Sequence, residues 1–289
     1  MGYAVIYDQL GCSPLCVLAT ETKIKHVIDD RRYQVLRFSE KSSILDNHRD
    51  HPIKLFVIPG GNYREMEPSL RPIAASIQRL VHQEGVNYLG ICAGGIAASK
   101  NYLYTPSSPL SKTVPHQNYD LTPYPLISEY LGLYPGSTCW LNIPKLGEST
   151  QLVEPIDVTV PPYPLYFHTG CFFPNAQQID NTSILLRYSD YSMQGVMTEP
   201  TGSKTEYQEI KPAAAIRHKK GDSKGNGNIV LSGIHPEIDE DLLSKQSPPA
   251  FQALQQNRQD AITTLATSTR EQERTLQLFF DALEIERKP

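Results

Sequence analysis

A cysteine turn flanked by glycines is the sequence feature that most constrains how this chain can fold. Residues 87–98 read Asn-Tyr-Leu-Gly-Ile-Cys-Ala-Gly-Gly-Ile-Ala-Ala, an apolar run followed by small residues. Gly90 and Gly94 stand two residues before and after Cys92. A strand that turns abruptly into a helix crowds its own backbone, and residues without a Cβ relieve that crowding. The pattern therefore predicts a strand, a sharp turn at Cys92 and a short helix.

Two interpretations of Cys92 follow from this turn. The turn would lift the thiol above the edge of a sheet, where the helix N-terminus favours a thiolate and can hold a developing oxyanion. Cys92 is then a catalytic nucleophile. The other interpretation is a buried small residue in a strand-to-helix turn, and the turn alone does not separate the two.

The residues around the turn predict a doubly wound α/β sheet. Apolar runs of the kind found in strands buried on both faces alternate with amphipathic stretches. The first helix should begin with Ser13 as its N-cap and Pro14 as its first residue. Strands are predicted at 3–7, 33–38, 54–58 and 86–91, and a second helix at 73–81. This order of elements is typical of a mostly parallel sheet with helices on both faces.

Two further regions complete the predicted single domain, residues 1–289. Residues 102–175 hold 12 of the 23 prolines and predict a long insertion in extended and turn conformations, either a binding wall or a lid that only packs. Residues 241–289 predict a helical extension, in which Ser268 begins a capping box. The apolar stripe of its last helix predicts docking on the core or, as the alternative, a homodimer contact.

A second group of residues with catalytic chemistry lies 143 positions beyond the cysteine. Residues 229–237 read as a strand ending in His235-Pro236-Glu237. Residues two apart in an extended segment point the same way, so the Glu237 carboxylate can orient the His235 imidazole. The imidazole would take the thiol proton and deliver it to a leaving group. His235 and Glu237 are therefore the candidate base and its orienting group.

A glycine pair after the third strand supplies the third signal. Residues 59–62 read Pro-Gly-Gly-Asn, and strand ends in a parallel sheet meet at one carboxyl edge. The amides of Gly61 and Ala93 are the candidates for an oxyanion hole, with Gly60 and Asn62 beside them. Three signals at the ends of three predicted strands favour a Cys-His-Glu site over an isolated buried cysteine.

These motifs resemble the class I glutamine amidotransferase fold. More specifically, they are similar to the amidotransferase-like domain at the N-terminus of eukaryotic biotin-protein ligases, which also occurs as a free-standing protein. The motifs that carry the resemblance are Gly11-x-Ser13-Pro14, Val57-Ile58-Pro59-Gly60-Gly61, Tyr88-Leu89-Gly90-Ile91-Cys92-Ala93-Gly94 and Leu231-Ser232-Gly233-x-His235-Pro236-Glu237. The resemblance covers most of residues 1–240 and implies a flavodoxin-like three-layer sandwich.

The resemblance also implies roles for individual residues. It assigns the nucleophile, base and orienting group to Cys92, His235 and Glu237. Residues 166–170, Tyr-Phe-His-Thr-Gly, resemble more loosely an aromatic-glycine segment facing the site, so His168 is a candidate substrate contact, with a structural histidine as the alternative.

One departure from the family pattern bears on the substrate. Glutamine amidotransferases generally carry a glutamine four residues after the nucleophile, where this chain has Ile96. An apolar side chain cannot replace the hydrogen bonds of that amide, which argues against free glutamine. We therefore expect a cysteine hydrolase or amidotransferase-like enzyme acting on a small amide, ester or peptide bond. The alternative is a non-catalytic binding or regulatory module, and no motif suggests that the chain is itself a biotin ligase.

Composition excludes several classes of partner and cofactor. A net charge of −4 shows no basic bias, so we expect neither a nucleic-acid nor a membrane partner. Five cysteines without paired spacing predict neither a disulfide framework nor a zinc site and favour a cytoplasmic protein. The histidines and carboxylates show no metal-ligand spacing and no nucleotide loop is evident, so no cofactor is expected.

Overall fold

The structure is a computed structural model of the chain, and it describes most of residues 1–289. The residues outside the description are 41, 46–50, 105–117, 124–130, 141–147, 157–159, 199–203, 220, 222–224, 248, 250–251 and 289. In the remainder, none of the helices is both long enough and apolar enough to cross a membrane.

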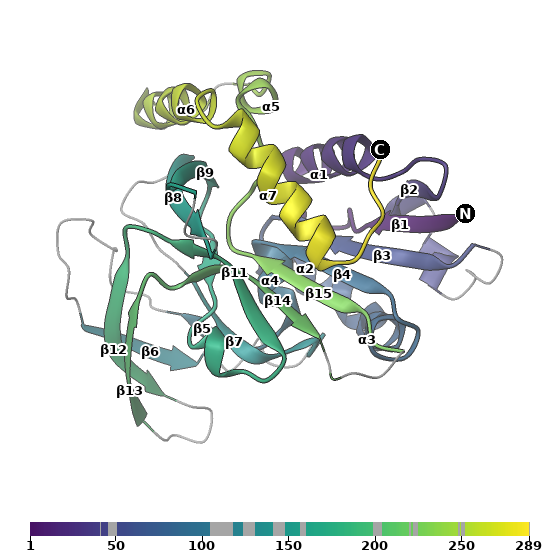
Figure 1. The fold of residues 1–289 in the computed structure, drawn as a ribbon, viewed down its shortest axis with the longest axis horizontal. Coiled ribbons are helices and arrows are strands. Elements are labelled where there is room, and N and C mark those ends of the chain that lie inside the picture. Colours follow the sequence, from purple (N-terminus) through teal and green to yellow (C-terminus); the bar gives the residue numbers. More distant parts are fainter. Residues whose placement is uncertain are drawn as a thin grey trace.

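A large mixed sheet forms the centre of the fold, in the order β2-β1-β3-β4-β15-β14-β11-β8-β9 (Figure 1). The first five strands of this order pair in parallel, and each later pairing is antiparallel. The parallel strands are β1 (Gly2–Ile6), β2 (Tyr33–Arg37), β3 (Ile53–Ile58), β4 (Asn87–Ile91) and β15 (Asn228–Ser232). The antiparallel strands are β8 (Ser149–Pro155), β9 (Tyr163–Phe167), β11 (Thr182–Tyr188) and β14 (Ala213–Lys219).

Helices cover both faces of this sheet. The helices are α1 (Pro14–Val27), α2 (Tyr63–Leu70), α3 (Ala74–Gln83), α4 (Ala93–Ala98), α5 (Glu240–Ser244), α6 (Gln252–Leu265) and α7 (Thr269–Ala282), with short 3-10 turns at Phe38–Glu40, Ser42–Leu45, Arg71–Ile73 and Ala176–Gln178. Successive residues of β1 alternate between the two cores: Ala4 packs with α1 and α7, and Val5 packs with α3 and α4. The chain is therefore an α/β three-layer sandwich of the flavodoxin-like type, as its sequence predicted.

A second sheet lies beside the first and comes mainly from the proline-rich region. Its order is β10-β7-β5-β6-β12-β13, at the lower left of Figure 1. Its strands are β5 (Ser99–Tyr104), β6 (Asn118–Pro123), β7 (Tyr134–Trp140), β10 (Cys171–Phe172), β12 (Ser192–Thr198) and β13 (Lys204–Ile210). The region predicted as an insertion also contributes β8 and β9 to the large sheet, so it does more than cover the core.

Two details of the helix ends differ from the predictions. Ser13 and Ser268 occupy the N-cap positions of α1 and α7, but neither side chain caps its helix. The Ser268 hydroxyl instead donates to the Pro164 carbonyl of β9 at 2.9 Å, so the predicted capping box is wrong. The apolar stripe of α7, including Phe279 and Phe280, is buried in the chain's own core, and docking rather than dimer contact explains it.

The two ends of the chain lie near one another (Figure 1). The amide of Gly2 donates to the Arg32 carbonyl at 2.7 Å, and that of Lys288 donates to the Val27 carbonyl at 2.9 Å. Ile28 also forms an antiparallel bridge with Arg287. Both ends are thus attached to the segment that joins α1 to β2.

Candidate active site

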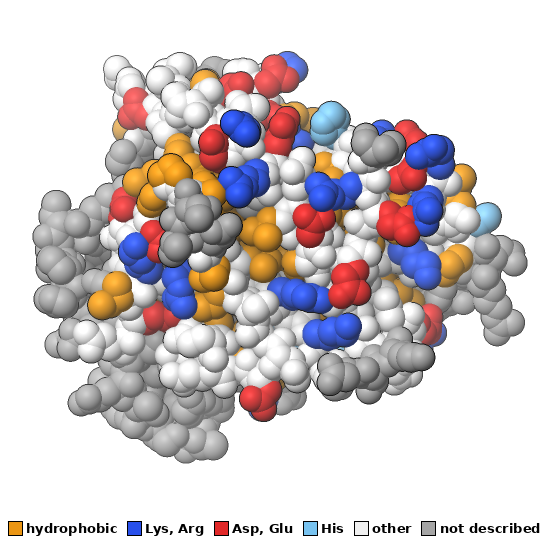
Figure 2. Space-filling view, in the orientation of Figure 1, with side chains coloured by type: hydrophobic (Ala, Val, Ile, Leu, Met, Phe, Trp, Pro, Cys, Tyr) orange, Lys and Arg blue, Asp and Glu red, His pale blue; other side chains and the backbone are white. Residues whose placement is uncertain are grey.

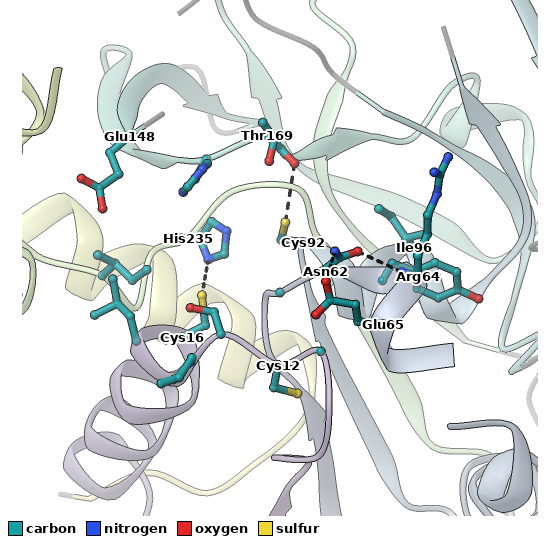
Figure 3. Close-up of a pocket in the computed structure, with 18 of the residues that line it drawn as sticks. Cys12, Cys16, Asn62, Arg64, Glu65, Cys92, Ile96, Glu148, Thr169 and His235 are labelled. Carbon is teal, nitrogen blue, oxygen red and sulfur yellow. Dashed lines mark hydrogen bonds between the residues drawn. The ribbon is translucent and has the colours of Figure 1, made fainter. Parts of the chain in front are cut away.

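A cavity of about 1080 Å³ opens at the carboxyl edge of the parallel strands. Loops that follow β1, β3, β4, β9 and β15 contribute to its wall, together with residues of α2 and α6. Cys92, His235, His168, Gly61 and Asn62 all line it. The fold therefore brings most of the predicted site residues to one cavity (Figure 3).

Cys92 lies at a strained turn between β4 and α4. Its φ of 52° and ψ of −105° place a non-glycine residue in a conformation that surrounding structure must impose. The Cys92 amide donates to the Ser232 carbonyl at 2.6 Å, which fixes the turn to the end of β15. A Cβ at Gly94 would overlap the Ile58 carbonyl, and one at Gly90 would overlap the Gly94 carbonyl. The two glycines are thus required by close backbone packing, as the sequence predicted.

His235 and Glu237 form a buried hydrogen-bonded pair beside Cys92. Nδ1 of His235 lies 2.8 Å from Oε1 of Glu237, and the two side chains are 2% and 1% exposed. Burial alone would lower the pKa of His235, but the Glu237 carboxylate and side-chain interactions with the Cys16 and Cys92 thiols raise it well above 6.5. Among the described residues, none bonds the other Glu237 oxygen, Oε2. The arrangement therefore favours the protonated form of the imidazole next to the Cys92 thiol.

Gly60 and Cys16 also pack against the His235 imidazole. A Cβ at Gly60 would overlap Cε1 of His235 and would lie 3.3 Å from Nε2 and 3.0 Å from Sγ of Cys16. Sγ of Cys16 in turn lies 3.9 Å from Nδ1 of His235. The His235 ring therefore lies directly against the Gly60 backbone, and only glycine fits at position 60.

The predicted oxyanion-hole residues differ in whether their backbone amides are already hydrogen-bonded. Among the described residues, the amides of Gly61 and Ala93 donate to no acceptor. The Asn62 amide donates to the Gly11 carbonyl at 2.8 Å, and its side chain accepts from the Arg64 amide and donates to Glu65. Asn62 therefore serves as the N-cap of α2, whereas Gly61 and Ala93 retain unpaired donors near Cys92.

His168 extends from the segment between β9 and β10 toward the same cavity. His168 is exposed at the cavity wall, where partial desolvation, followed by the nearby charge of His235, lowers the pKa of its imidazole and favours the neutral form. The carbonyl oxygen of Thr169, the residue after His168, accepts a hydrogen bond from the Cys92 thiol at 3.8 Å. This segment thus lies beside Cys92 and contributes a neutral imidazole to the cavity wall.

A chain of contacts links α6 to His235 and was not predicted. The Arg258 guanidinium binds the Glu148 carboxylate through Nε and through Nη2, the latter at 2.8 Å. The Tyr166 hydroxyl also bonds Glu148, and the Tyr166 ring packs edge-on against His235 with ring centroids 5.6 Å apart. The His235 amide donates to the Tyr166 carbonyl at 3.0 Å. The C-terminal helices therefore support the imidazole through Glu148 and Tyr166.

Replacing Arg258 by methionine is expected to lower the free energy of unfolding by about 2 kcal/mol, because Glu148 would stay buried without its cation. Arg287→Met is the matched control, since its pair with Asp281 is more exposed and should contribute under about 1 kcal/mol. Urea unfolding of both variants measures the difference. Equal losses would contradict the assignment of a buried pair.

Cys16, His235 and Glu237 also form a cluster that could hold a metal ion. One potential ligand atom from each lies within 4.8 Å of the others, and all three residues are buried. Nδ1 of His235 is already bonded to Glu237, so a bound cation would displace that hydrogen bond. The geometry of the pair is explained without a metal.

Sequence reasoning missed Cys16, Glu148 and Arg258 as parts of the site. Cys16 lies only two residues after Pro14, in the first turn of α1, but nothing local indicates that it faces His235. Arg258 and Glu148 are 110 residues apart. No motif joins them, and only the packing of α6 beside β8 reveals their proximity.

Comparisons with known proteins identify related sequences and folds. A family model described as "Biotin-protein ligase, N terminal" matches residues 3–288. The biotin–protein ligase of Schizosaccharomyces pombe (strain 972 / ATCC 24843) is 24% identical over 250 residues, 81% of this chain and 33% of that protein. The chain thus spans about a third of the length of that relative.

One solved structure with a TM-score above 0.5 shows the same fold. A glutamine amidotransferase from Thermotoga maritima matches with a TM-score of 0.54 at 12% identity, over 98% of each chain. A second glutamine amidotransferase structure matches with a TM-score of 0.49 at 14% identity, over 91% of this chain and 100% of that one.

Proposed function

Since the chain belongs to the family of biotin-protein ligase N-terminal domains and has the glutamine amidotransferase fold, we propose that it is a cysteine-dependent acyl-transfer enzyme. It cleaves an amide, ester or peptide bond through Cys92, His235 and Glu237. The observation that supports this most directly is the thiol of a strained turn placed beside a buried His-Glu pair in an open cavity.

The charges at the site suit a thiolate nucleophile. The raised pKa of His235 keeps the imidazole protonated near neutral pH, and an imidazolium stabilises an adjacent thiolate. Cys92 also occupies the N-cap position of α4, where backbone amides point outward. Glu237 fixes which ring nitrogen faces the thiol, because it is bonded to Nδ1.

The reaction follows from these placements. Sγ of Cys92 attacks the carbonyl carbon, and the amides of Gly61 and Ala93 bind the oxygen that becomes negative. His235 gives its proton to the leaving nitrogen or oxygen as the C–N or C–O bond breaks, which leaves a thioester. His235 then takes a proton from water as the water oxygen attacks the thioester carbonyl carbon. The C–S bond breaks, which releases the acid and restores the Cys92 thiolate beside the protonated imidazole.

A binding or regulatory module is the second candidate. It is favoured by the match to only a third of a larger biotin–protein ligase, in which this region is one part of a longer chain. In that case the cavity would bind a ligand without turning it over, and Cys92 would be dispensable.

The pH dependence of Cys92 alkylation tests the proposal. We expect iodoacetamide to modify Cys92 selectively at about pH 6.5, where an ordinary thiol with a pKa near 8.5 is about 1% ionised. Burial raises the pKa of Cys12 to about 12 and raises those of Cys139 and Cys171, so these thiols are slow internal controls. Peptide mass spectrometry measures each rate.

Two variants determine whether His235 is responsible for the reactivity of Cys92 at low pH. His235→Ala should remove the low-pH reactivity of Cys92, whereas His218→Ala deletes another buried imidazole, one that bonds Thr182 away from the cavity, and should preserve it. Cys92 reacting no faster than Cys16, or reacting equally in all three proteins, would contradict a catalytic role and leave the binding module as the better proposal.

A further inference from the structure

The position of His235 indicates which side of the cavity holds the leaving group of a substrate and which side holds its acyl group. The group that protonates a leaving atom must lie on the leaving-group side of the scissile bond, so that side faces His235. Figure 3 shows Cys92 between His235 and Ile96, with Glu148 on the His235 side and Arg64 on the Ile96 side. The acyl part of a substrate therefore extends toward Ile96.

The Ile96 side of the cavity is built from apolar and aromatic side chains. Ile96 lies one helical turn after Cys92, and its amide donates to the Cys92 carbonyl at 3.1 Å. Tyr102 lines the same cavity, and the Tyr63 ring lies beside it with centroids 6.5 Å apart. The side chains of Ile96, Tyr63 and Tyr102 are all buried. They form what we call the acyl subsite.

The acyl subsite contains two neutral polar groups, the hydroxyls of Tyr63 and Tyr102. Tyr102 is 9% exposed, and burial, together with the neighbouring Cys139, Cys171 and Cys92 thiols, raises its pKa well above the ordinary value of 10.0. The Tyr102 hydroxyl has no hydrogen-bond partner within the part of the chain that the structure describes. Arg64 and Glu65 also line the cavity, but both are exposed.

The leaving-group side has the opposite character. His168, Glu148 and Arg258 line it, and the Arg258–Glu148 pair is largely buried. Polar or charged groups of an amine or alcohol find hydrogen-bonding partners there. A charged amino-acid head within the acyl subsite would find only tyrosine hydroxyls, because Arg64 and Glu65 are exposed, and an unpaired buried charge is strongly unfavourable.

We infer that the acyl subsite of Ile96, Tyr63 and Tyr102 selects an apolar acyl group, and that the polar side of the cavity takes the leaving amine or alcohol. This inference rests on the proposed acyl transfer at Cys92 and names the class of substrate that the same site accepts. It separates this chain from enzymes that bind the polar head of glutamine one helical turn beyond the nucleophile.

A series of p-nitrophenyl esters tests the inference, because the leaving group is constant while the acyl chain varies. We expect kcat/KM to be at least about tenfold higher for hexanoate than for acetate, after correction for uncatalysed hydrolysis, since each buried methylene contributes about fourfold. Intact-mass spectrometry should show the matching acyl adduct, mapped to Cys92. Equal kcat/KM for acetate and hexanoate, with an adduct on Cys92, would overturn the inference while the proposed function stands.

Two substitutions of Ile96 test whether the preference for hexanoate over acetate depends on this side chain. Ile96→Gln should reduce the hexanoate preference over acetate about tenfold, because an amide replaces apolar surface. Ile96→Leu is the matched control, since it keeps apolar volume and should preserve the preference within about threefold. A preference retained in Ile96→Gln would remove Ile96 from the subsite.

Binding to the Cys92→Ala protein tests the subsite without any chemistry. We expect calorimetry to detect hexanamide binding and to detect weaker or no binding of glutamine. Tighter binding of glutamine would overturn the inference even if no ester forms an adduct. Absence of every adduct together with hexanamide binding would instead overturn the proposed function and support an apolar-ligand module.

Discussion

Replacing Glu237 by glutamine is expected to slow Cys92-dependent ester turnover by about 10²- to 10⁴-fold. The amide keeps the size of the side chain but removes the Glu237 charge that raises the pKa of His235, so burial would then be opposed only by the Cys16 and Cys92 thiols and the pKa would fall. A neutral imidazole cannot stabilise the thiolate, and an amide NH2 group facing Nδ1 favours the wrong tautomer. Steady-state kinetics with p-nitrophenyl hexanoate measures the loss.

The same substitution should change stability in a pH-dependent way. The folded-state pKa of His235 is raised, so its stabilisation is fully present below 6.5 and is lost as the pH rises through the folded value. We expect Glu237→Gln to cost about 3 kcal/mol of unfolding free energy at about pH 6 and much less above the folded pKa. A difference that is constant with pH, or turnover within about threefold of the parent, would contradict the role of this pair.

Replacing Gly60 by alanine is expected to reduce turnover about 10²-fold and leave the chain folded. The new methyl group would overlap the His235 ring and press on Sγ of Cys16, so the imidazole must move away from its place beside Cys92. Both obstructing groups are side chains rather than backbone, which allows the fold to adjust. A misplacement of about 1 Å at a reacting group is enough for a loss of this size.

Gly95→Ala is the matched control for this substitution. Its Cβ would have its closest contacts at 3.4 Å, with Phe173 and the Ser232 carbonyl, so it requires only slight adjustment. We expect near-parental turnover for Gly95→Ala and similar unfolding midpoints for both variants. Turnover of Gly60→Ala at the parental level would show that the His235 ring does not need the space above Gly60.

Features that depend on local backbone geometry could be predicted from the sequence. The elbow at Cys92 needs glycines at fixed positions because its own backbone crowds there, and those glycines are visible in the chain. The alternation of apolar runs similarly predicted the parallel strands and their burial on two faces. His235 and Glu237 are two residues apart, so their pairing was also a local inference.

Features that depend on distant packing could not be predicted. Cys16 contacts His235, which is 219 residues away, and Arg258 of α6 bonds Glu148, which is 110 residues away. Helix α2 was missed for a local reason, since Pro68 lies within it and proline is unfavourable in helix interiors. Ser268 has the residue type of an N-cap, but a nearby carbonyl of β9 competes for its hydroxyl.

The attachment of both chain ends to the α1–β2 segment has a consequence for larger assemblies. That segment lies at the amino edge of the parallel strands, whereas the cavity opens at their carboxyl edge. A domain fused to either end would therefore emerge on the side of the sheet opposite Cys92. Such a fusion can add a second activity to this fold without blocking substrate access.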